Sequence, residues 1–193
     1  MATASVRKRK IMKIKTLKIG DREIGVKEDG IVVFPEWVSS HGHRRKRRET
    51  MGFYHWNGYR RVSLNIDGAP KKFFVHRLVA EAFLPGWNES LEVDHRNGKK
   101  DDNRVSNLRM VTHKQNGRAS KKAFGAVPYR GVRREPRSSI NPFQAQIRLD
   151  GKYHYLGLFP TAEKAARAFD KAAIKFGFFP EALNFPPNLA TNA

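Results

Sequence analysis

The sequence predicts an α+β protein made of two small domains, and three observations lead to that prediction. Short runs that alternate apolar and polar residues are separated by Asp-Gly pairs, which is typical of antiparallel β-hairpins. Two other stretches, 77–83 and 161–176, repeat apolar residues at helical spacing. Between them the pattern breaks around 121–128, so we expect the boundary between the two domains there.

The first domain is expected over 18–122, after a flexible basic arm over 1–17. Asp-Gly pairs at 29–30 and 67–68 each lie between runs rich in β-formers and predict two hairpins. The helix over 77–83 follows the second hairpin, and a proline two residues later ends it. The hairpins are therefore predicted to precede the first helix of the chain.

The rest of the first domain is predicted to form a strand, a turn, a loop and a helix. Residues 93–95 have the composition of a short strand, and the Asn-Gly pair at 97–98 predicts a tight turn after it. Thr112 has the side chain of a helix N-cap, so we expect a helix over about 113–122.

The second domain is expected over 128–187, followed by a tail over 188–193. Three short runs predict a three-stranded antiparallel sheet, with an Asp-Gly pair at 150–151 between the last two. These runs are residues 129–133, 143–148 and 153–159. Thr161 predicts the cap of a single helix, whose small alanines allow it to pack closely on the sheet.

The charge of the chain points to a polyanionic partner. Lys and Arg number 38 against 18 Asp and Glu, a net charge of +20 that would repel itself in a compact fold. Hydrophobic residues make up 39% of the 193, enough for two modest cores. Nucleic acid is therefore the first candidate partner, and an anionic membrane surface is the second.

The same composition argues against several other classes of protein. No apolar run approaches the roughly 18 residues of a membrane-spanning helix, so we expect no membrane partner. The basic N-terminus lacks the apolar core of a signal peptide, which predicts a cytoplasmic protein. Cysteine is absent, which excludes disulfides and cysteine-ligated zinc.

Four polar residues form the parts of a one-metal nuclease site: Asp94, His95, Asn107 and Asn116. Imidazole titrates near neutrality, so His95 suits the removal of a proton from water. Asp94 is its neighbour on an extended segment, where adjacent side chains point to opposite faces, so its carboxylate can bind a metal while His95 faces the water. Asn116 can bring an amide oxygen to the same ion from the following helix. Such hard oxygen ligands predict one Mg²⁺ or Mn²⁺ ion per site.

These residues resemble the HNH endonuclease family in its homing-endonuclease branch. The matching stretches are VHRLVAEAF (75–83), VDHRNG (93–98) and NRVSNLRMVT (103–112), closed by Asn116. The resemblance covers roughly residues 55–120 and implies a ββα-metal core made of a hairpin and a helix.

The resemblance also assigns roles to individual residues. It implies that Asp94 and Asn116 are metal ligands and that His95 is the general base. It further implies that Asn107 braces the loop and orients His95. We expect His76, at the start of the upstream helix, to be structural or to contact phosphate.

The second domain resembles the AP2/ERF DNA-binding family. The matching stretches are YRGVR (129–133), FQAQIR (143–148), LGLF (156–159), TAEKAARAFDKAA (161–173) and LNFP (183–186). In that family the sheet lies in the major groove and the helix packs behind it. The resemblance implies DNA contacts from five residues: Arg130, Arg133, Gln146, Arg148 and Tyr155. Phe143 departs from the family, where a tryptophan is usual, so the mode of groove binding carries over better than any sequence preference.

One strongly basic run lies in the first domain: Arg44, Arg45, Lys46, Arg47 and Arg48. It has no apolar periodicity, so we expect a solvated loop. The favoured interpretation is a contact with DNA phosphates, and the alternatives are a solvated tract without a partner or a nuclear localisation signal.

Together these features predict a metal-dependent DNA endonuclease of the HNH homing type, encoded by a bacterium or a phage. We expect a monomer that binds double-stranded DNA and nicks one strand per active site. The main alternative is a non-catalytic DNA-binding regulator with a vestigial nuclease core. A third interpretation, an RNA-binding protein, requires a platform of exposed aromatic side chains, for which the sequence shows no motif.

Overall fold

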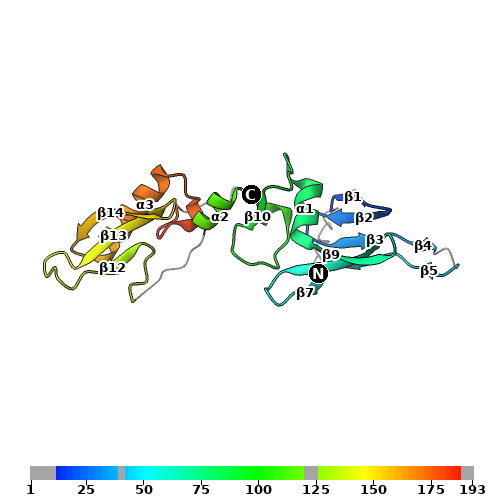
Figure 1. The fold of residues 1–193 in the computed structure, drawn as a ribbon, viewed down its shortest axis with the longest axis horizontal. Helices are drawn as coiled ribbons and strands as arrows, with labels where there is room; N and C mark the ends of the chain where they lie inside the picture. Colours follow the sequence, from blue (N-terminus) through cyan, green and yellow to red (C-terminus); the bar gives the residue numbers. More distant parts are fainter. Residues whose placement is uncertain (1–11, 39–41, 120–125, 188–193) are drawn as a thin grey trace, which may run out of the picture. The chain divides into compact units, whose positions relative to one another are not determined.

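The computed structural model describes residues 12–38, 42–119 and 126–187 of the chain (Figure 1). Contacts between residues divide the chain into two compact units, Met1–Met110 and Val111–Ala193. This division falls earlier than the boundary that we expected around 121–128, and residues 120–125 lie outside the described part. Each unit is therefore considered separately.

The first unit opens with a four-stranded antiparallel sheet in the order β1-β2-β3-β6. Its strands are β1 (Ile14–Ile19), β2 (Arg22–Lys27), β3 (Val32–Phe34) and β6 (Arg48–Thr50). The predicted hairpin at 29–30 is confirmed by the pairing of β2 with β3. Residues 14–17 belong to β1, so the expectation of a flexible arm as far as residue 17 was wrong for them, and residues 1–11 lie outside the described part.

Two further sheets follow in the same unit. Strands β4 (Trp37–Val38) and β5 (Arg44–Arg45) pair with each other. Strands β7 (Phe53–Tyr54), β8 (Arg60–Ile66) and β9 (Ala69–Phe74) form a three-stranded antiparallel sheet. The Asp-Gly pair that joins β8 to β9 has positive φ at both residues, as the tight hairpin turn requires, and this confirms the second predicted hairpin.

Helix α1 (Val75–Phe83) organises the core of this unit. It begins two residues before the predicted start, directly after β9, and it contacts β1, β2, β8 and β9. Its buried face packs with apolar side chains from the two larger sheets. The largest of these that are almost fully buried include Ile24, Val26 and Val79.

A short two-stranded sheet lies at the end of the first unit. It consists of β10 (Glu92–His95) and β11 (Leu108–Val111), with the 3₁₀ turn η1 (Val105–Asn107) between them. The strand predicted at 93–95 and the turn predicted at 97–98 are both confirmed, since the Gly98 N–H donates to the His95 carbonyl oxygen at 2.8 Å. A backbone hydrogen bond also attaches this loop to the turn between β2 and β3, because the Val105 N–H donates to Glu28 O at 2.8 Å.

The second unit has the predicted sheet and helix. Strands β12 (Val132–Arg134), β13 (Phe143–Leu149) and β14 (Lys152–Phe159) form an antiparallel sheet, and α3 (Ala162–Lys175) packs against all three. Thr161 caps α3 as predicted, accepting a hydrogen bond from the Lys164 N–H at 3.2 Å. A 3₁₀ turn η2 (Pro180–Ala182) follows.

The segment after α3 closes the second unit through one buried carboxylate. Asp170 on α3 accepts hydrogen bonds from the backbone N–H groups of Asn184 and Phe185, both at 2.8 Å. The Asn184 side chain then bonds both the N–H and the carbonyl oxygen of Arg130. The LNFP stretch therefore connects the helix to the start of the sheet.

Helix α2 (His113–Ala119) also belongs to the second unit. Lys114 forms an ion pair with Asp150 at 2.7 Å, and Arg118 donates to Phe176 O at 2.9 Å. Thr112 caps α2 as predicted, since its hydroxyl accepts from the Gln115 N–H at 3.2 Å. The helix that follows the nuclease-like motif is thus bound to the unit that resembles a DNA-binding domain.

None of the helices in the described part of the chain is long and apolar enough to cross a membrane.

Candidate active site and basic surfaces

Strand β10 presents two adjacent polar side chains, Asp94 and His95. Along this strand, half-buried and buried residues alternate, so the two side chains lie on opposite faces as the extended backbone requires. Asp94 accepts from Arg109 at its Oδ2 atom, at 2.8 Å from Nε and 2.7 Å from Nη2. Arg109 is itself buried, which makes this pair a fixed part of the unit rather than a loose surface contact.

His95 lies inside the unit rather than facing open water. Only 6% of its surface is exposed, and the expectation that it faces the attacking water stays a prediction. Its Nε2 atom lies 3.2 Å from the side-chain oxygen of Asn103. An amide oxygen only accepts, so the Nε2 nitrogen carries the proton in this contact and Nδ1 is the basic nitrogen.

The surroundings of His95 keep its ring neutral. Burial lowers the pKa of His95 below its usual value, while the hydrogen bond with Asn103 and the nearby Asp94 act in the opposite direction. A neutral imidazole is the form that can accept a proton. The ring also lies against two other rings, with centroids 5.3 Å from His76 and 5.8 Å from Tyr59.

Asn107 braces the loop after β10. Its Oδ1 accepts from the Asn97 N–H at 3.1 Å, and its Nδ2 donates to Asp102 O at 2.8 Å. These contacts agree with the bracing role that we expected. The contact that orients His95, however, is made by Asn103, a buried residue that the sequence interpretation missed.

Asn103 is itself held by the turn between β2 and β3. A Cβ atom added at Gly30 would lie 2.8 Å from Asn103 Cβ and 3.1 Å from its carbonyl oxygen. Gly30 also has φ +90°, a conformation that other residues rarely adopt. The glycine therefore permits the close approach that places Asn103 beside His95.

His76 is packed inside the same group of rings. It is 7% exposed, and its ring centroid lies 4.8 Å from that of Tyr59. Among the described residues its buried Nδ1 has no hydrogen-bond partner. Burial, followed by the charges of His95 and Arg77, lowers the pKa of His76 to about 3. This burial favours the structural role over the phosphate contact.

Asn116 lies on α2, where its side chain is half-buried and its N–H donates to Thr112 O at 2.9 Å. Because α2 belongs to the second unit, the pairing of Asn116 with Asp94 at one metal stays a prediction. No group of three or more His, Cys, Asp and Glu side chains suited to a metal occurs in the described part of the chain. A site built from one carboxylate and one amide oxygen needs no such group.

The basic run of the first unit is not a loop throughout. Arg44 and Arg45 form strand β5, and Arg48 begins β6, so the expectation of a solvated loop was wrong for these residues. All five side chains of the run are exposed. Four of them, Arg45 to Arg48, line a groove of about 720 Å³ with Arg22 and Trp37. The cationic surface that phosphate binding needs is therefore present, and the contact itself stays a prediction.

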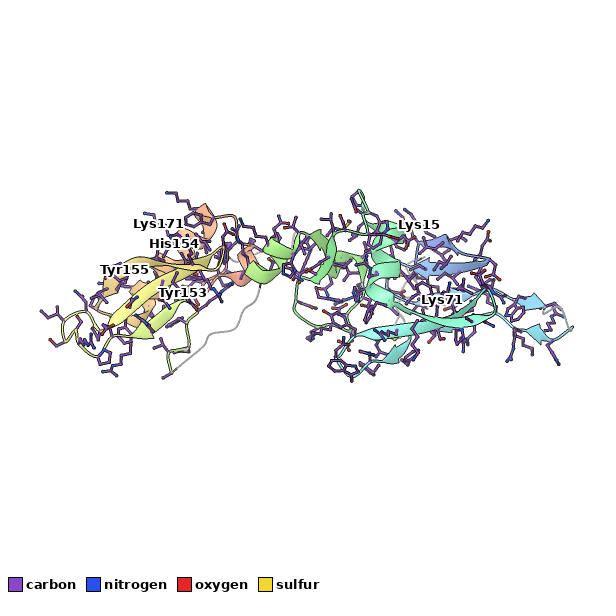
Figure 2. All side chains as sticks on the ribbon, viewed as in Figure 1. Lys15, Lys71, Tyr153, His154, Tyr155 and Lys171 are labelled. Atoms are coloured by element: carbon purple, nitrogen blue, oxygen red, sulfur yellow. The ribbon has the colours of Figure 1, made fainter. Side chains whose placement is uncertain are left out.

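One face of the C-terminal sheet carries most of the predicted DNA contacts. Alternation along β13 places Gln144, Gln146 and Arg148 on the face opposite α3. Across the strands Gln146 pairs with Tyr155, Arg148 with Tyr153, and Arg133 with Gln144. Tyr153 and Tyr155 are exposed along β14 (Figure 2). Tyr153 was missed, although it lies two residues before Tyr155 on an alternating strand.

Arg130 differs from the other predicted contacts. Its guanidinium donates to the carbonyl oxygens of Arg118 and Ala182, at 2.9 and 3.2 Å. It also lies 5.1 Å above the ring of Phe178, and burial lowers its pKa. These contacts favour a structural role for Arg130, in which it connects α2 to the rest of the second unit.

Comparison with known proteins finds one family model that matches part of the chain and several proteins that are similar to parts of it. Residues 73–118 match the family model described as HNH endonuclease. DNA endonuclease I-HmuI of Bacillus phage SP01 is 52% identical over 60 residues, which cover 31% of this chain and 34% of that protein. APETALA2-like protein 2 of Oryza sativa subsp. indica is 42% identical over 65 residues, which cover 34% of this chain and 15% of that protein.

A solved structure, described as DNA binding and cleavage by the HNH homing endonuclease I-HmuI, matches with 38% identity and a TM-score of 0.38, covering 49% of each chain. The chain thus spans about a third of the length of I-HmuI in sequence and a smaller part of the plant protein. The segment that carries Asp94, His95, Asn103 and Asn107 is therefore similar to HNH endonucleases.

Proposed function

We propose that this protein is a metal-dependent DNA endonuclease of the HNH homing type, which nicks one strand per active site and is targeted by an AP2-like C-terminal unit. The observation that carries the proposal is the pair of adjacent side chains on β10. Asp94 is held by Arg109 and His95 by Asn103, inside the segment that matches the HNH endonuclease family model. A fixed carboxylate next to a neutral, oriented imidazole is what hydrolysis of a phosphodiester requires.

His95 acts as the general base in this proposal. Its Nδ1 takes a proton from a water molecule, whose oxygen then forms a bond to phosphorus while the bond to the leaving sugar oxygen breaks. The leaving oxygen takes a proton from solvent. Asn103 keeps the proton of the resting ring on Nε2, so that Nδ1 has a free lone pair. General-base catalysis of this kind contributes about 10² to 10⁴-fold.

Asp94 and Asn116 would hold the cation, because carboxylate and amide oxygens are the donors that Mg²⁺ and Mn²⁺ prefer. The ion would supply stabilisation of the charge that develops on the phosphate and on the leaving oxygen. Arg109 contacts Oδ2 of Asp94 and so fixes the direction in which the carboxylate presents Oδ1. The buried Arg109 thereby acts as a positioning residue for the proposed ligand.

Binding in this proposal is divided between the two units. The exposed basic run of the first unit grips phosphates, and the exposed face of β12, β13 and β14 lies against the DNA with Arg133, Gln146, Arg148 and Tyr155. A net charge of +20 supports a strong, salt-sensitive attraction to the backbone. One active site per monomer accounts for a nick rather than a double-strand break.

Supercoiled plasmid is the substrate that tests the proposal, because one nick converts it to the open circle. The full chain is incubated with plasmid and Mg²⁺ or Mn²⁺, with EDTA as the metal-free control. We expect open circles with either ion and none in EDTA, and we expect Asp94→Ala to remove the activity while leaving binding to plasmid. Full activity in EDTA would exclude the mechanism. Binding without any nicking, by a folded wild-type protein with metal present, would support the alternative of a DNA-binding regulator.

A further inference from the structure

The turn between β7 and β8 carries the most exposed of the large apolar side chains in the described ranges. Trp56 is 90% exposed, whereas a tryptophan usually contributes to a core. The turn itself is well ordered by hydrogen bonds. The Gly58 N–H donates to His55 O at 2.9 Å, the His55 N–H to Tyr59 O at 2.8 Å, and the Tyr59 N–H to the side chain of Asn57 at 3.3 Å.

This turn is fastened to the loop that holds the candidate active site. Lys100 Nζ donates to the carbonyl oxygen of Asn57 at 3.0 Å. The Tyr54 hydroxyl donates to Asp101 at 3.0 Å. The ring of Tyr59, at the end of the turn, lies 5.8 Å from that of His95 between centroids. The turn that carries Trp56 therefore contacts the loop after β10 and, through the ring of Tyr59, the ring of the proposed general base.

A second exposed aromatic ring and two cations lie beside this turn. Tyr54, at the end of β7 and two residues before Trp56, is 61% exposed. The Arg60 guanidinium lies 4.0 Å above the ring of Tyr54, and the Lys100 ammonium lies 5.0 Å above that of Tyr59. Flat aromatic faces interleaved with cations are the surface that unstacked bases and their phosphates bind.

We propose that Trp56 stacks on a base of the strand that is cut, next to the scissile phosphate. The proposal rests on the proposed function, since it assumes that DNA lies at His95. An apolar side chain that enters a base step partly unstacks it and kinks the duplex. The cations beside the turn favour DNA as the occupant, because they neutralise the phosphates on either side of the stacked base. The tryptophan would thereby hold one strand in place for attack.

Removal of the ring tests this proposal. Trp56→Ala is compared with Trp56→Phe and with Ile174→Ala, which removes another exposed apolar side chain, on α3. Binding is measured to a fluorescein-labelled mixed-sequence oligonucleotide, as a single strand and as a duplex, without metal. We expect Trp56→Ala to bind about 5- to 150-fold more weakly, as base stacking on an aromatic side chain predicts. Trp56→Phe should retain most of the affinity, and Ile174→Ala should bind like the wild type.

Tryptophan fluorescence gives a second readout, because stacking on a base quenches the indole. The wild type and Trp56→Phe are titrated with the same unlabelled oligonucleotides. We expect quenching at saturation in the wild type that is much smaller in Trp56→Phe, in which Trp37 and Trp87 remain. Equal affinity of Trp56→Ala and wild type, or equal quenching with and without Trp56, would overturn the proposal. Tighter binding and stronger Trp56-dependent quenching by single-stranded RNA of the same sequence would overturn DNA as the occupant.

The outcome for Trp56 is separable from the outcome for the nuclease. A wild type that nicks plasmid while Trp56→Ala binds and nicks equally well contradicts the stacking proposal only. A wild type that shows Trp56-dependent quenching but never nicks contradicts the nuclease function only. Circular dichroism of each variant confirms that the fold is intact, which the exposure of Trp56 leads us to expect.

Discussion

The two units of this chain place their polar side chains in opposite ways. In the first unit the two candidate active-site residues of β10 are buried or half-buried and are held by buried partners, His95 by Asn103 and Asp94 by Arg109. In the second unit the residues that resemble DNA contacts are exposed on an open sheet, as with Arg148 and Tyr155. The labelled side chains of Tyr153 and Tyr155 lie on that sheet in Figure 2.

The difference follows from what proton transfer and DNA binding each require. Proton transfer needs a group held in one orientation and one protonation state, and burial with a hydrogen-bonded partner supplies both. Contact with DNA needs side chains that adjust to a partner and are free of the core, and an exposed sheet face supplies these. Substitutions at the buried site residues of the first unit should therefore act on rate, and substitutions on the exposed sheet face of the second unit should act on affinity.

The largest effect is expected from the general base. His95→Ala should lower the rate of plasmid nicking by about 10² to 10⁴-fold, because general-base catalysis contributes that much. Binding to the same plasmid should stay close to the wild type, since the ring is almost fully buried. Nicking at the wild-type rate would show that His95 is not the base, and His154→Ala, at an exposed position of β14 that pairs with Ile147, is the control for removal of an imidazole elsewhere in the chain.

The contrasting prediction for the second unit concerns Arg148, which is exposed on β13. Arg148→Ala should weaken binding by about 1–3 kcal/mol and relax the preference at one base pair if the side chain reads a base. If it grips phosphate, all sequences should weaken alike. The measurement is a titration against random and selected duplexes at several salt concentrations. Unchanged binding of every duplex would remove Arg148 from the interface, and Lys175→Ala on α3 is the control for the loss of one charge.

A positioning residue should have a smaller effect on rate than the base itself. Asn103→Ala should lower the rate of nicking by about 10- to 100-fold, the range found when the partner of a site residue is removed. Asn103→Asp, which keeps an oxygen that accepts from Nε2, should recover part of that loss and shift the pH profile. A variant that unfolds gives no rate, so Gly30→Ala provides the second test, since it displaces Asn103 from the other side.

The pH dependence of stability should come from the first unit. Burial lowers the pKa of His76 from 6.5 to about 3, so between these values the unfolded chain binds a proton that the folded chain does not. The stability that depends on neutral His76 is therefore complete above pH 6.5 and is lost progressively as the pH falls toward 3. At pH 5 the loss should be about 2 kcal/mol.

Chemical unfolding of the wild type and of His76→Phe, at pH 7 and at pH 5, checks this. The phenylalanine keeps an aromatic ring against Tyr59 but does not titrate, so the loss of unfolding free energy between the two pH values should be smaller in the variant. An equal loss in both proteins would assign the pH dependence to other groups.

Local sequence patterns predicted the turns and helix ends that neighbouring residues determine. The Asp-Gly pairs gave three hairpins, because the two residues themselves adopt the positive φ or the tight turn. Thr161 was sufficient to predict the start of α3. Strands β5 and β6, in the basic run, were not predicted because no alternation marks them and their pairing partners lie elsewhere in the chain.

Prediction of the candidate site from the sequence was limited in the same way. Asp94 and His95 were identified because they are adjacent and chemically distinctive. Asn103 and Arg109 were missed because their importance depends on contacts across a loop that only the folded chain brings together. The exposure of Trp56 was not predicted for the same reason, because only the folded chain shows which aromatic side chains stay outside the core.

Helix α2 has a consequence for how such proteins are assembled from parts. It follows the nuclease-like motif in the chain, yet its ion pair from Lys114 and its hydrogen bonds at Arg118 are made within the C-terminal unit. A gene fusion that replaces everything after residue 126 would leave these side chains without Asp150 and Phe176, and the proposed ligand Asn116 on an unsupported helix. The C-terminal unit therefore cannot be exchanged by itself, and a working chimaera must redesign the surface of α2 together with the unit that it exchanges.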